Sequence, residues 1–221
     1  MLAAGVEWAR LCGLGGAGAV LYAAGLGLGF AALYNVDLQW PALVLAAAFW
    51  IFAAPFWMWR GVSARPRVLL ACGLVVILPA ALAMAALSPR QLLLVLVLVW
   101  VADSAAYFAG RRWGRRKLAP SISPGKTLEG ALGGLLGAMA YAIICGTFLE
   151  DLAWGPYVVA AALLAVLSIV GDLFESAVKR QAGAKDSGTL LPGHGGILDR
   201  IDSATAVLPV AALALPWIGA R

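Results

Sequence analysis

The stretch QLLLVLVLVWVADSAAYFAG, residues 91–110, decides the fold, because Asp103 is its only charged residue. A helix that crosses a bilayer needs about 20 consecutive, mostly apolar residues, and this stretch has that length and composition. The whole chain follows the same pattern: 63% of its 221 residues are hydrophobic and 12% are charged. An ordinary soluble domain carries about 25% charged residues. So few polar side chains cannot cover a globular surface in water, and lipid must form part of the solvent.

Six further stretches have the composition of membrane spans, which gives about seven in all. They are residues 13–34, 41–59, 68–87, 128–149, 156–178 and 203–219. The sequence therefore predicts an all-α fold, a polytopic transmembrane helix bundle of about seven spans. Nothing marks a second domain, so we expect residues 1–221 to form a single integral-membrane domain. The three cysteines lie in apolar stretches, without the spacing of a disulfide framework or a metal site.

Lysine and arginine residues divide unevenly between the two ends of these spans. With seven spans, 14 of the 16 fall on one side, and only Arg90 and Arg221 fall on the other. Cytoplasmic loops carry the excess of positive charge. We therefore expect the loops 110–127 and 179–202, which lie on the crowded side, to face the cytoplasm. The net charge of +5 belongs to such short loops and does not indicate nucleic-acid binding.

The second of these loops combines cations, carboxylates and glycines. Four cations suit a polyphosphate, and carboxylates among them suit a divalent cation, which is usually held by one or two carboxylates plus substrate phosphates. Glycines beside a histidine let the backbone approach a ligand closely and leave N–H groups open. A merely solvated, positively charged loop would explain the lysines and arginines but not the other residues. The candidates are Lys179, Arg180, Lys185, Arg200, Asp186, Asp199, Asp202, His194, Gly195 and Gly196.

Two carboxylates lie inside predicted spans. Asp172 precedes Ser176 by four residues, so the two side chains share one helix face, one turn apart. Asp103 lies within residues 91–110, where a carboxylate costs about 2.5–3.5 kcal/mol on insertion scales and should face the bundle interior or a wet cavity. Asp103 is therefore a functional candidate. The alternative is an interhelical hydrogen-bond partner with no catalytic role.

The first loop offers Ser123, Lys126 and Thr127 as further phosphate-binding candidates at the start of the fifth span. A helix N-terminus favours anions, although simple helix capping also explains these residue types. The Gly-Lys-Thr run is not a P-loop, because that motif needs a glycine where Pro120 stands and a strand before it. The basic run 111–117 fits either a topology anchor or a site for anionic lipid headgroups.

These residues together resemble a known family, the phosphatidate cytidylyltransferases. The resemblance is carried by the segment Ser176-x-Val178-Lys179-Arg180, four residues, Lys185-Asp186-x-Gly188, two residues, Leu191-Pro192-x-His194-Gly195-Gly196-Ile197-x-Asp199-Arg200-Ile201-Asp202. Asp103 with Tyr107 and Gly110, and the segment 123–130, resemble the family at the matching places. The resemblance runs from about residue 7 to the C-terminus. Members usually carry one or two hydrophobic helices ahead of this point, so we expect those helices to be missing here.

The resemblance implies an activity, with its cofactors and partners. Such an enzyme transfers CMP from CTP to phosphatidate, which gives CDP-diacylglycerol for phospholipid biosynthesis and releases pyrophosphate. It implies Mg²⁺ or Mn²⁺ as cofactor, with room for a second cation such as K⁺. The implied partners are CTP, phosphatidate, membrane lipids and a second copy of the chain in a homodimer. The implied location is the bacterial inner membrane, with the active site facing the cytoplasm.

The resemblance also gives each candidate residue an expected role. Asp172 and Asp199, followed by Asp202, are expected to hold the metal. Lys179, Arg180 and Arg200 are expected to hold phosphates, with Ser176 beside the metal. His194 is expected to order the Gly-Gly turn or to contact CTP, and Asp103 to complete a cavity that the lipid headgroup reaches sideways from the bilayer. The expected substrate-binding set is Asp103, Ser123, Lys126, Thr127, Lys185, Asp186, His194, Gly195 and Gly196.

Other classes of protein fit the sequence less well. A CTP-dependent lipid kinase of the polyprenol or dolichol type is the main alternative, and the complete Asp199-Arg200-Ile201-Asp202 run argues against it. A CDP-alcohol phosphotransferase spaces its aspartates differently. A small transporter would use paired repeats and broken helices at the midplane, whereas the polar residues here gather in two loops on one side.

Overall fold

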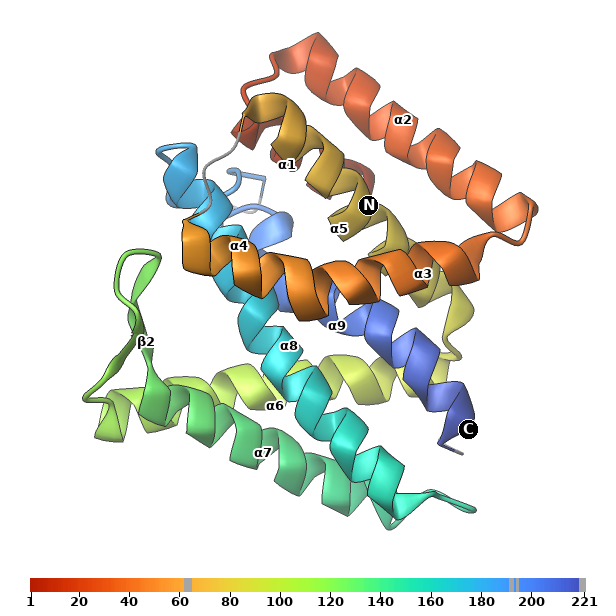
Figure 1. Cartoon of the computed structure of the whole chain (residues 1–221), viewed down its shortest axis with the longest axis vertical. Helices are drawn as coiled ribbons and strands as arrows, with labels where there is room; N and C mark the ends of the chain where they lie inside the picture. Colours follow the sequence, from red (N-terminus) through yellow and green to blue (C-terminus); the bar gives the residue numbers. More distant parts are fainter. Residues whose placement is uncertain (62–64, 191–192, 194, 219–221) are drawn as a thin grey trace.

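The computed structural model describes residues 1–61, 65–190, 193 and 195–218. These residues are almost entirely helical, with one short β-hairpin at one end of the bundle (Figure 1). The helices are α1 (Leu2–Leu11), α2 (Gly16–Asn35), α3 (Gln39–Ala48), α4 (Ala54–Arg60), α5 (Pro66–Ala86), α6 (Pro89–Trp113), α7 (Leu128–Gly146), α8 (Trp154–Gln181) and α9 (Leu198–Ala214). A π-helical turn, Phe49–Ala53, joins α3 to α4, and a 3-10 turn, Leu215–Trp217, follows α9. The strands are β1 (Lys117–Ala119) and β2 (Ser123–Thr127).

Six segments of the described chain are long and apolar enough to cross a membrane. They are α2, the continuous α3–α4 segment, α5, α6, α7 and α8. These segments confirm six of the predicted spans, and the chain is an integral membrane protein with the predicted all-α bundle. Successive spans run in opposite directions, so the hairpin and the loop after α8 come to the same end of the bundle (Figure 1).

The seventh predicted span, 203–219, corresponds to α9, which differs from the other six. It begins earlier, at Leu198, and has 17 residues. It packs against α8, α5, α3, α6 and α1, and it lies behind α3 in the middle of the view in Figure 1. Every residue from Ser203 to Ala212 is buried. The described residues therefore form six spans of full length. The seventh predicted span is a shorter helix enclosed by protein, whose apolar run reflects core packing rather than contact with lipid.

α6 and α7 form a closely packed antiparallel pair. A Cβ atom added at Gly134 would lie 2.9 Å from the carbonyl oxygen of Ala102, and one at Gly137 would lie 2.6 Å from Cβ of Ala105. Small residues let the backbones of membrane helices approach each other in this way. The close pairing fixes the orientation of α6, which carries Asp103.

An aromatic cluster anchors the C-terminal half of α8. Phe174 packs edge-on against Phe49 and Trp50, with ring centroids 5.4 and 5.5 Å apart. The π-helical turn that carries these two rings has a simple cause in Pro55, which lacks an N–H donor and whose ring clashes with the carbonyl four residues earlier. Because Phe174 lies two residues after Asp172, the cluster fixes the part of α8 that bears the site.

The hairpin between α6 and α7 was not part of the helical prediction. β1 and β2 pair antiparallel. The carboxylate of Glu129 accepts hydrogen bonds from the backbone N–H groups of Arg115 (3.0 Å) and Arg116 (3.2 Å), which ties the base of the hairpin to α7. Oγ1 of Thr127 accepts a hydrogen bond of 3.1 Å from the N–H of Gly130 and caps α7. The capping alternative considered for Thr127 is therefore observed.

Candidate active site

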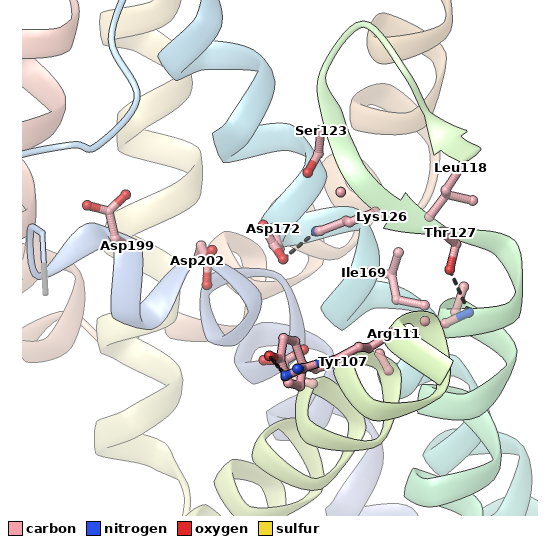
Figure 2. A pocket seen from close by; sticks show the side chains of 16 residues that line it. Tyr107, Arg111, Leu118, Ser123, Lys126, Thr127, Ile169, Asp172, Asp199 and Asp202 are labelled. Carbon is pink, nitrogen blue, oxygen red and sulfur yellow. Dashed lines mark hydrogen bonds and ion pairs between the residues drawn. The ribbon is translucent and has the colours of Figure 1, made fainter. Parts of the chain in front are cut away.

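A cavity of about 540 Å³ opens at the end of the bundle that bears the hairpin. Its walls come from α6, the hairpin, the start of α7, α8 and α9 (Figure 2). It gathers residues that are up to about a hundred positions apart in the chain, from both loops and both intramembrane positions singled out in the sequence. The predicted site residues that line it are Asp103, Ser123, Lys126, Thr127, Asp172, Asp199 and Asp202.

Asp172 links α8 to the hairpin through an ion pair. Its carboxylate forms an ion pair with the ammonium group of Lys126, which reaches over from β2 (Figure 2). Oγ of Ser176 donates a hydrogen bond of 3.4 Å to Oδ1 of Asp172, so the two side chains share one helix face as predicted. Asp103 accepts a hydrogen bond of 3.2 Å from Oγ of Ser168 on α8. Asp103 thus has an interhelical partner and lines the cavity at once.

Asp199, in the first turn of α9, accepts hydrogen bonds on both carboxylate oxygens. Nζ of Lys179 lies 2.6 Å from Oδ1. Oδ2 accepts from N and Oγ of Ser187, both at 2.9 Å, and from N of Gly196 at 2.8 Å. Burial alone would raise the pKa of Asp199, but the bonds from Lys179, Gly196 and Ser187 outweigh it and lower the pKa to about 2. Asp199 is therefore held ionised and in one orientation.

The backbone N–H of Gly196 contradicts one expectation for the glycines before α9. We expected their N–H groups to be open to a ligand, yet the N–H of Gly196 is bound to Asp199. Gly195 has φ of +83°, and a Cβ there would lie 2.7 Å from Oδ2 of Asp199. Gly195 therefore makes room for the carboxylate of Asp199, and Gly196 donates a hydrogen bond to it. His194 lies outside the described residues.

Several predicted residues lie beside the cavity rather than in its wall. The guanidinium of Arg180 donates to the carbonyl oxygens of Ile122 (3.4 Å) and Ala184 (3.3 Å), so it links the end of α8 to the tip of the hairpin. The ammonium group of Lys179 contacts Asp199, but Lys179 is not among the residues that line the cavity. Exposed side chains at Lys185, Asp186 and Arg200 lie on the same end of the bundle.

Two buried carboxylates were missed by the sequence reasoning. Glu175 is 3% exposed, and its Oε1 lies 3.3 Å from Nζ of Lys179. Glu7 is 4% exposed and accepts hydrogen bonds from the start of α9. Glu175 falls one turn before Lys179, and this spacing was an available indication of an ion pair. Glu7 had only its position in an apolar stretch to mark it, because its partners lie some 190 residues away.

Two further residues in the cavity wall come from α6. Nη1 of Arg111 donates a hydrogen bond of 3.1 Å to the hydroxyl of Tyr107, and both side chains line the cavity (Figure 2). Asp103, Tyr107 and Arg111 are spaced by four residues and so follow one face of α6. The cavity therefore has a polar stripe that runs from the basic end of α6 into the span.

The donor set fits a divalent cation in its chemistry. Asp172, Asp199 and Asp202 all line the cavity, and hard divalent cations prefer carboxylate oxygens. As they stand, no three carboxylate, imidazole or thiol groups among the described residues form a ready metal site. Instead, lysines neutralise two of the aspartates, Lys126 at Asp172 and Lys179 at Asp199. A cation would therefore share these carboxylates with ammonium groups already present.

The fold and the cavity define an integral membrane protein with a phosphate-compatible, carboxylate-rich site at one end of its helix bundle. The chain belongs to the cytidylyltransferase family, which it matches over residues 6–217. It is similar to a phosphatidate cytidylyltransferase of Pseudomonas aeruginosa, with 44% identity over 228 residues that cover 96% of this chain and 82% of the relative.

Other relatives match over shorter stretches. The phosphatidate cytidylyltransferase of Haemophilus influenzae is 50% identical over 123 residues, which cover 53% of this chain and 43% of the relative. That of Thermotoga maritima is 46% identical over 125 residues, which cover 54% of this chain and 46% of the relative. These matches support the resemblance noted in the sequence, and none of them favours the lipid kinase.

Proposed function

We propose that this chain transfers CMP from CTP to phosphatidate, which yields CDP-diacylglycerol and pyrophosphate. One observation carries the proposal: aspartates from α6, α8 and α9 face cations of the hairpin and α6 across one cavity at the end of a membrane bundle. Such a cavity can bind a soluble polyphosphate from the aqueous side and a phosphate-bearing lipid from the bilayer. The family and the names of the relatives support the same reaction.

In the proposed reaction, a phosphate oxygen of phosphatidate attacks the α-phosphorus of CTP. A new P–O bond forms as the bond from the α-phosphorus to the bridging oxygen of the β-phosphate breaks, and pyrophosphate leaves with that electron pair. Phosphoryl-type transfer depends mainly on positioning and on neutralising charge. Lys126 and Ser123, which both line the cavity from the hairpin, would hold the triphosphate. No general base is needed, because a phosphate monoester is already a nucleophile.

We propose that Asp172, Asp199 and Asp202 hold Mg²⁺ or Mn²⁺ with the triphosphate. Bound there, the cation would polarise phosphoryl oxygens and offset the charge of the leaving pyrophosphate. The ammonium group of Lys126, released from Asp172, would then be free to bind a phosphate oxygen. Lys179 keeps Asp199 ionised and oriented. A second cation such as K⁺ belongs to the same proposal.

We propose that the lipid headgroup reaches the cavity along the polar stripe of α6. Arg111 offers a guanidinium to the lipid phosphate, a geometry that suits bidentate binding. The hydroxyl of Tyr107 and the carboxylate of Asp103 continue the stripe toward the bilayer interior. Tyr107 is 57% exposed and next to the exposed Phe108, which supports contact between this wall and lipid. The acyl chains can therefore stay in the bilayer while the headgroup reacts.

The test uses CTP labelled at two different phosphorus atoms. Purified protein in phosphatidate-containing micelles with Mg²⁺ is given either [α-³²P]CTP or [γ-³²P]CTP, and chloroform-extractable label is counted. Cytidylyl transfer moves the α label into lipid and leaves the γ label in water. A lipid kinase given its alcohol acceptor does the opposite, so label from the γ position alone would overturn the proposal.

Matched variants connect the activity to the cavity. Asp172→Asn removes a charge from the cavity wall, whereas Asp37→Asn makes the same chemical change in the turn between α2 and α3, where φ is +56° and asparagine is tolerated. Asp172→Asn and EDTA should each abolish the α label in lipid, and Asp37→Asn should retain it. Equal activity in both variants would separate the reaction from this cavity.

We further propose that the hairpin end of the bundle faces the cytoplasm, in a bacterial inner membrane. The excess of lysine and arginine at this end supports that orientation. Residues 1–221 are proposed to form one integral-membrane domain, which assembles as a homodimer. Labelling of a cysteine placed at exposed Lys185 in sealed vesicles of known orientation tests the first point, and cross-linking in native membranes tests the last.

A further inference from the structure

We infer that Glu7 of α1 is a positioning residue for the active site: its carboxylate holds two segments, residues 187–188 and 196–198, so that Asp199 is presented to the cavity. The inference rests on the proposed function for what Asp199 does in the reaction. Glu7 does not line the cavity and is buried, so it cannot touch either substrate. Its effect must pass through the residues that it binds.

Glu7 caps α9 from a distant part of the chain. Its Oε1 accepts a hydrogen bond of 3.0 Å from N of Ile197, and its Oε2 accepts one of 2.8 Å from N of Leu198. The first N–H groups of a helix have no intrahelical partner. The N-cap residue of α9 is Ile197, whose apolar side chain cannot supply an acceptor. A negative charge at a helix N-terminus is also favoured by the helix dipole, so Glu7 supplies what the local sequence lacks.

Glycines in both segments leave space for this carboxylate. A Cβ atom added at Gly188 would lie 2.8 Å from Oε1 of Glu7, and one at Gly196 would lie 2.6 Å from Oε2. Only glycine leaves room for the carboxylate at both places. Gly188 and Gly196 both belong to the segment 176–202 that carries the family resemblance, and neither lines the cavity.

Ser187 connects Glu7 to Asp199. Its Oγ lies 3.2 Å from Oε2 of Glu7 and 2.9 Å from Oδ2 of Asp199. A serine hydroxyl has one proton to donate, so the two carboxylates share this donor. Its backbone N–H is bound to Asp199 as well. Glu7 therefore fixes both segments whose N–H groups hold Asp199, at Ser187 and at Gly196.

The test compares Glu7→Gln with Glu150→Gln. A glutamine at position 7 has one oxygen and one NH₂ group, so it cannot accept at both Oε positions and faces at least one N–H donor with another. Glu150 is exposed in the turn between α7 and α8, where the same change touches neither of these two segments. Two quantities are measured: the Mg²⁺ concentration for half-maximal CMP transfer, and the rate of tryptic cleavage after Lys185 relative to cleavage within 111–117.

If Glu7 positions Asp199, the half-maximal Mg²⁺ concentration rises about tenfold in Glu7→Gln, as expected when the support of a metal-binding group is lost. The maximal rate at saturating Mg²⁺ recovers to within about threefold, and the relative cleavage at Lys185 increases. Glu150→Gln matches the wild type in both respects. A lower rate with unchanged Mg²⁺ dependence and unchanged cleavage at Lys185 overturns the inference, because that pattern describes a merely stabilising cap.

A second variant covers the case in which Glu7→Gln does not fold, which rapid cleavage at all sites would reveal. Ser187→Ala keeps the cap on α9 and removes only the shared hydroxyl, so a raised Mg²⁺ requirement supports the inference and a wild-type response overturns it. The cleavage comparison needs no activity. If wild-type protein never transfers CMP, the proposed function fails. The cleavage at Lys185 still decides whether Glu7 holds the segments 187–188 and 196–198.

Discussion

Replacement of Lys179 by methionine gives the sharpest test of the charge network beneath the cavity. Methionine keeps an unbranched side chain of similar length and removes the ammonium group. In the wild type this group lies 2.6 Å from Asp199 and 3.3 Å from Glu175. The side chains of Lys179, Asp199 and Glu175 are 11%, 9% and 4% exposed, so water cannot replace the lost partner.

The size of the effect follows from what remains after the change. Asp199 keeps its hydrogen bonds from Ser187 and Gly196. Glu175, by contrast, has no hydrogen-bond partner for either oxygen among the described residues apart from its ion pair with Lys179. Breaking a buried ion pair by removing one partner costs roughly 3–5 kcal/mol. At about 2–4 °C per kcal/mol for a protein of this size, the midpoint of thermal unfolding should fall by about 6–20 °C.

The assay is thermal unfolding of the purified protein in detergent at one fixed heating rate. Lys185→Met serves as the control, because Lys185 is exposed near the same end of the bundle and should shift the midpoint by less than about 2 °C. Adding Glu175→Gln to Lys179→Met should restore most of the loss, since it neutralises the stranded carboxylate. A midpoint for Lys179→Met within about 2 °C of the wild type, or no recovery in the double variant, would refute this account of the network.

Three further predictions concern single contacts. Thr127→Ala should destabilise the protein by about 1 kcal/mol by removing the cap on α7, and Thr127→Ser should not, as measured by thermal unfolding. Gly134→Ala should cost about 1–3 kcal/mol, because its Cβ would lie 2.9 Å from the backbone oxygen of Ala102, whereas Gly125→Ala, with open space around it, should be neutral. The pKa of Asp199 is lowered to about 2 from 3.8, so its ionisation stabilises the fold above pH 4 and this contribution is lost as the pH falls toward 2. Asp199→Asn should remove that part of the acid dependence, and an unchanged acid profile would contradict it.

The spans and the position of the site could be predicted because each depends on a local pattern. Apolar runs of about 20 residues identify the membrane helices whatever their neighbours are. The uneven placement of lysine and arginine predicted that the hairpin segment and the loop after α8 lie at one end of the bundle, and the structure has them there (Figure 1). Asp172 and Ser176 were correctly placed on one face by their spacing alone.

What could not be predicted depends on contacts between distant segments. In the sequence, Glu7 is one carboxylate in a short apolar stretch. Its role could not be predicted, because its partners Ile197 and Leu198 meet it only in the folded protein. The hairpin is too short and too polar to show a strand period, and Glu129, which binds the backbone at its base, follows it in the chain. The apolar run of α9 looks like any other span, since burial in protein and burial in lipid select the same residue types.

The central place of α9 has a consequence for biosynthesis. The ribosome makes this helix after α3, α5 and α8, yet all three pack against it. Those helices must enter the membrane before their common neighbour exists, and helices already in the bilayer can still associate afterwards. Until residues 198–214 are made, α3, α5 and α8 lack the helix against which all three pack. The same residues bring Asp199 and Asp202 to the cavity, so a chain interrupted before this point lacks both its central helix and two of the proposed metal ligands.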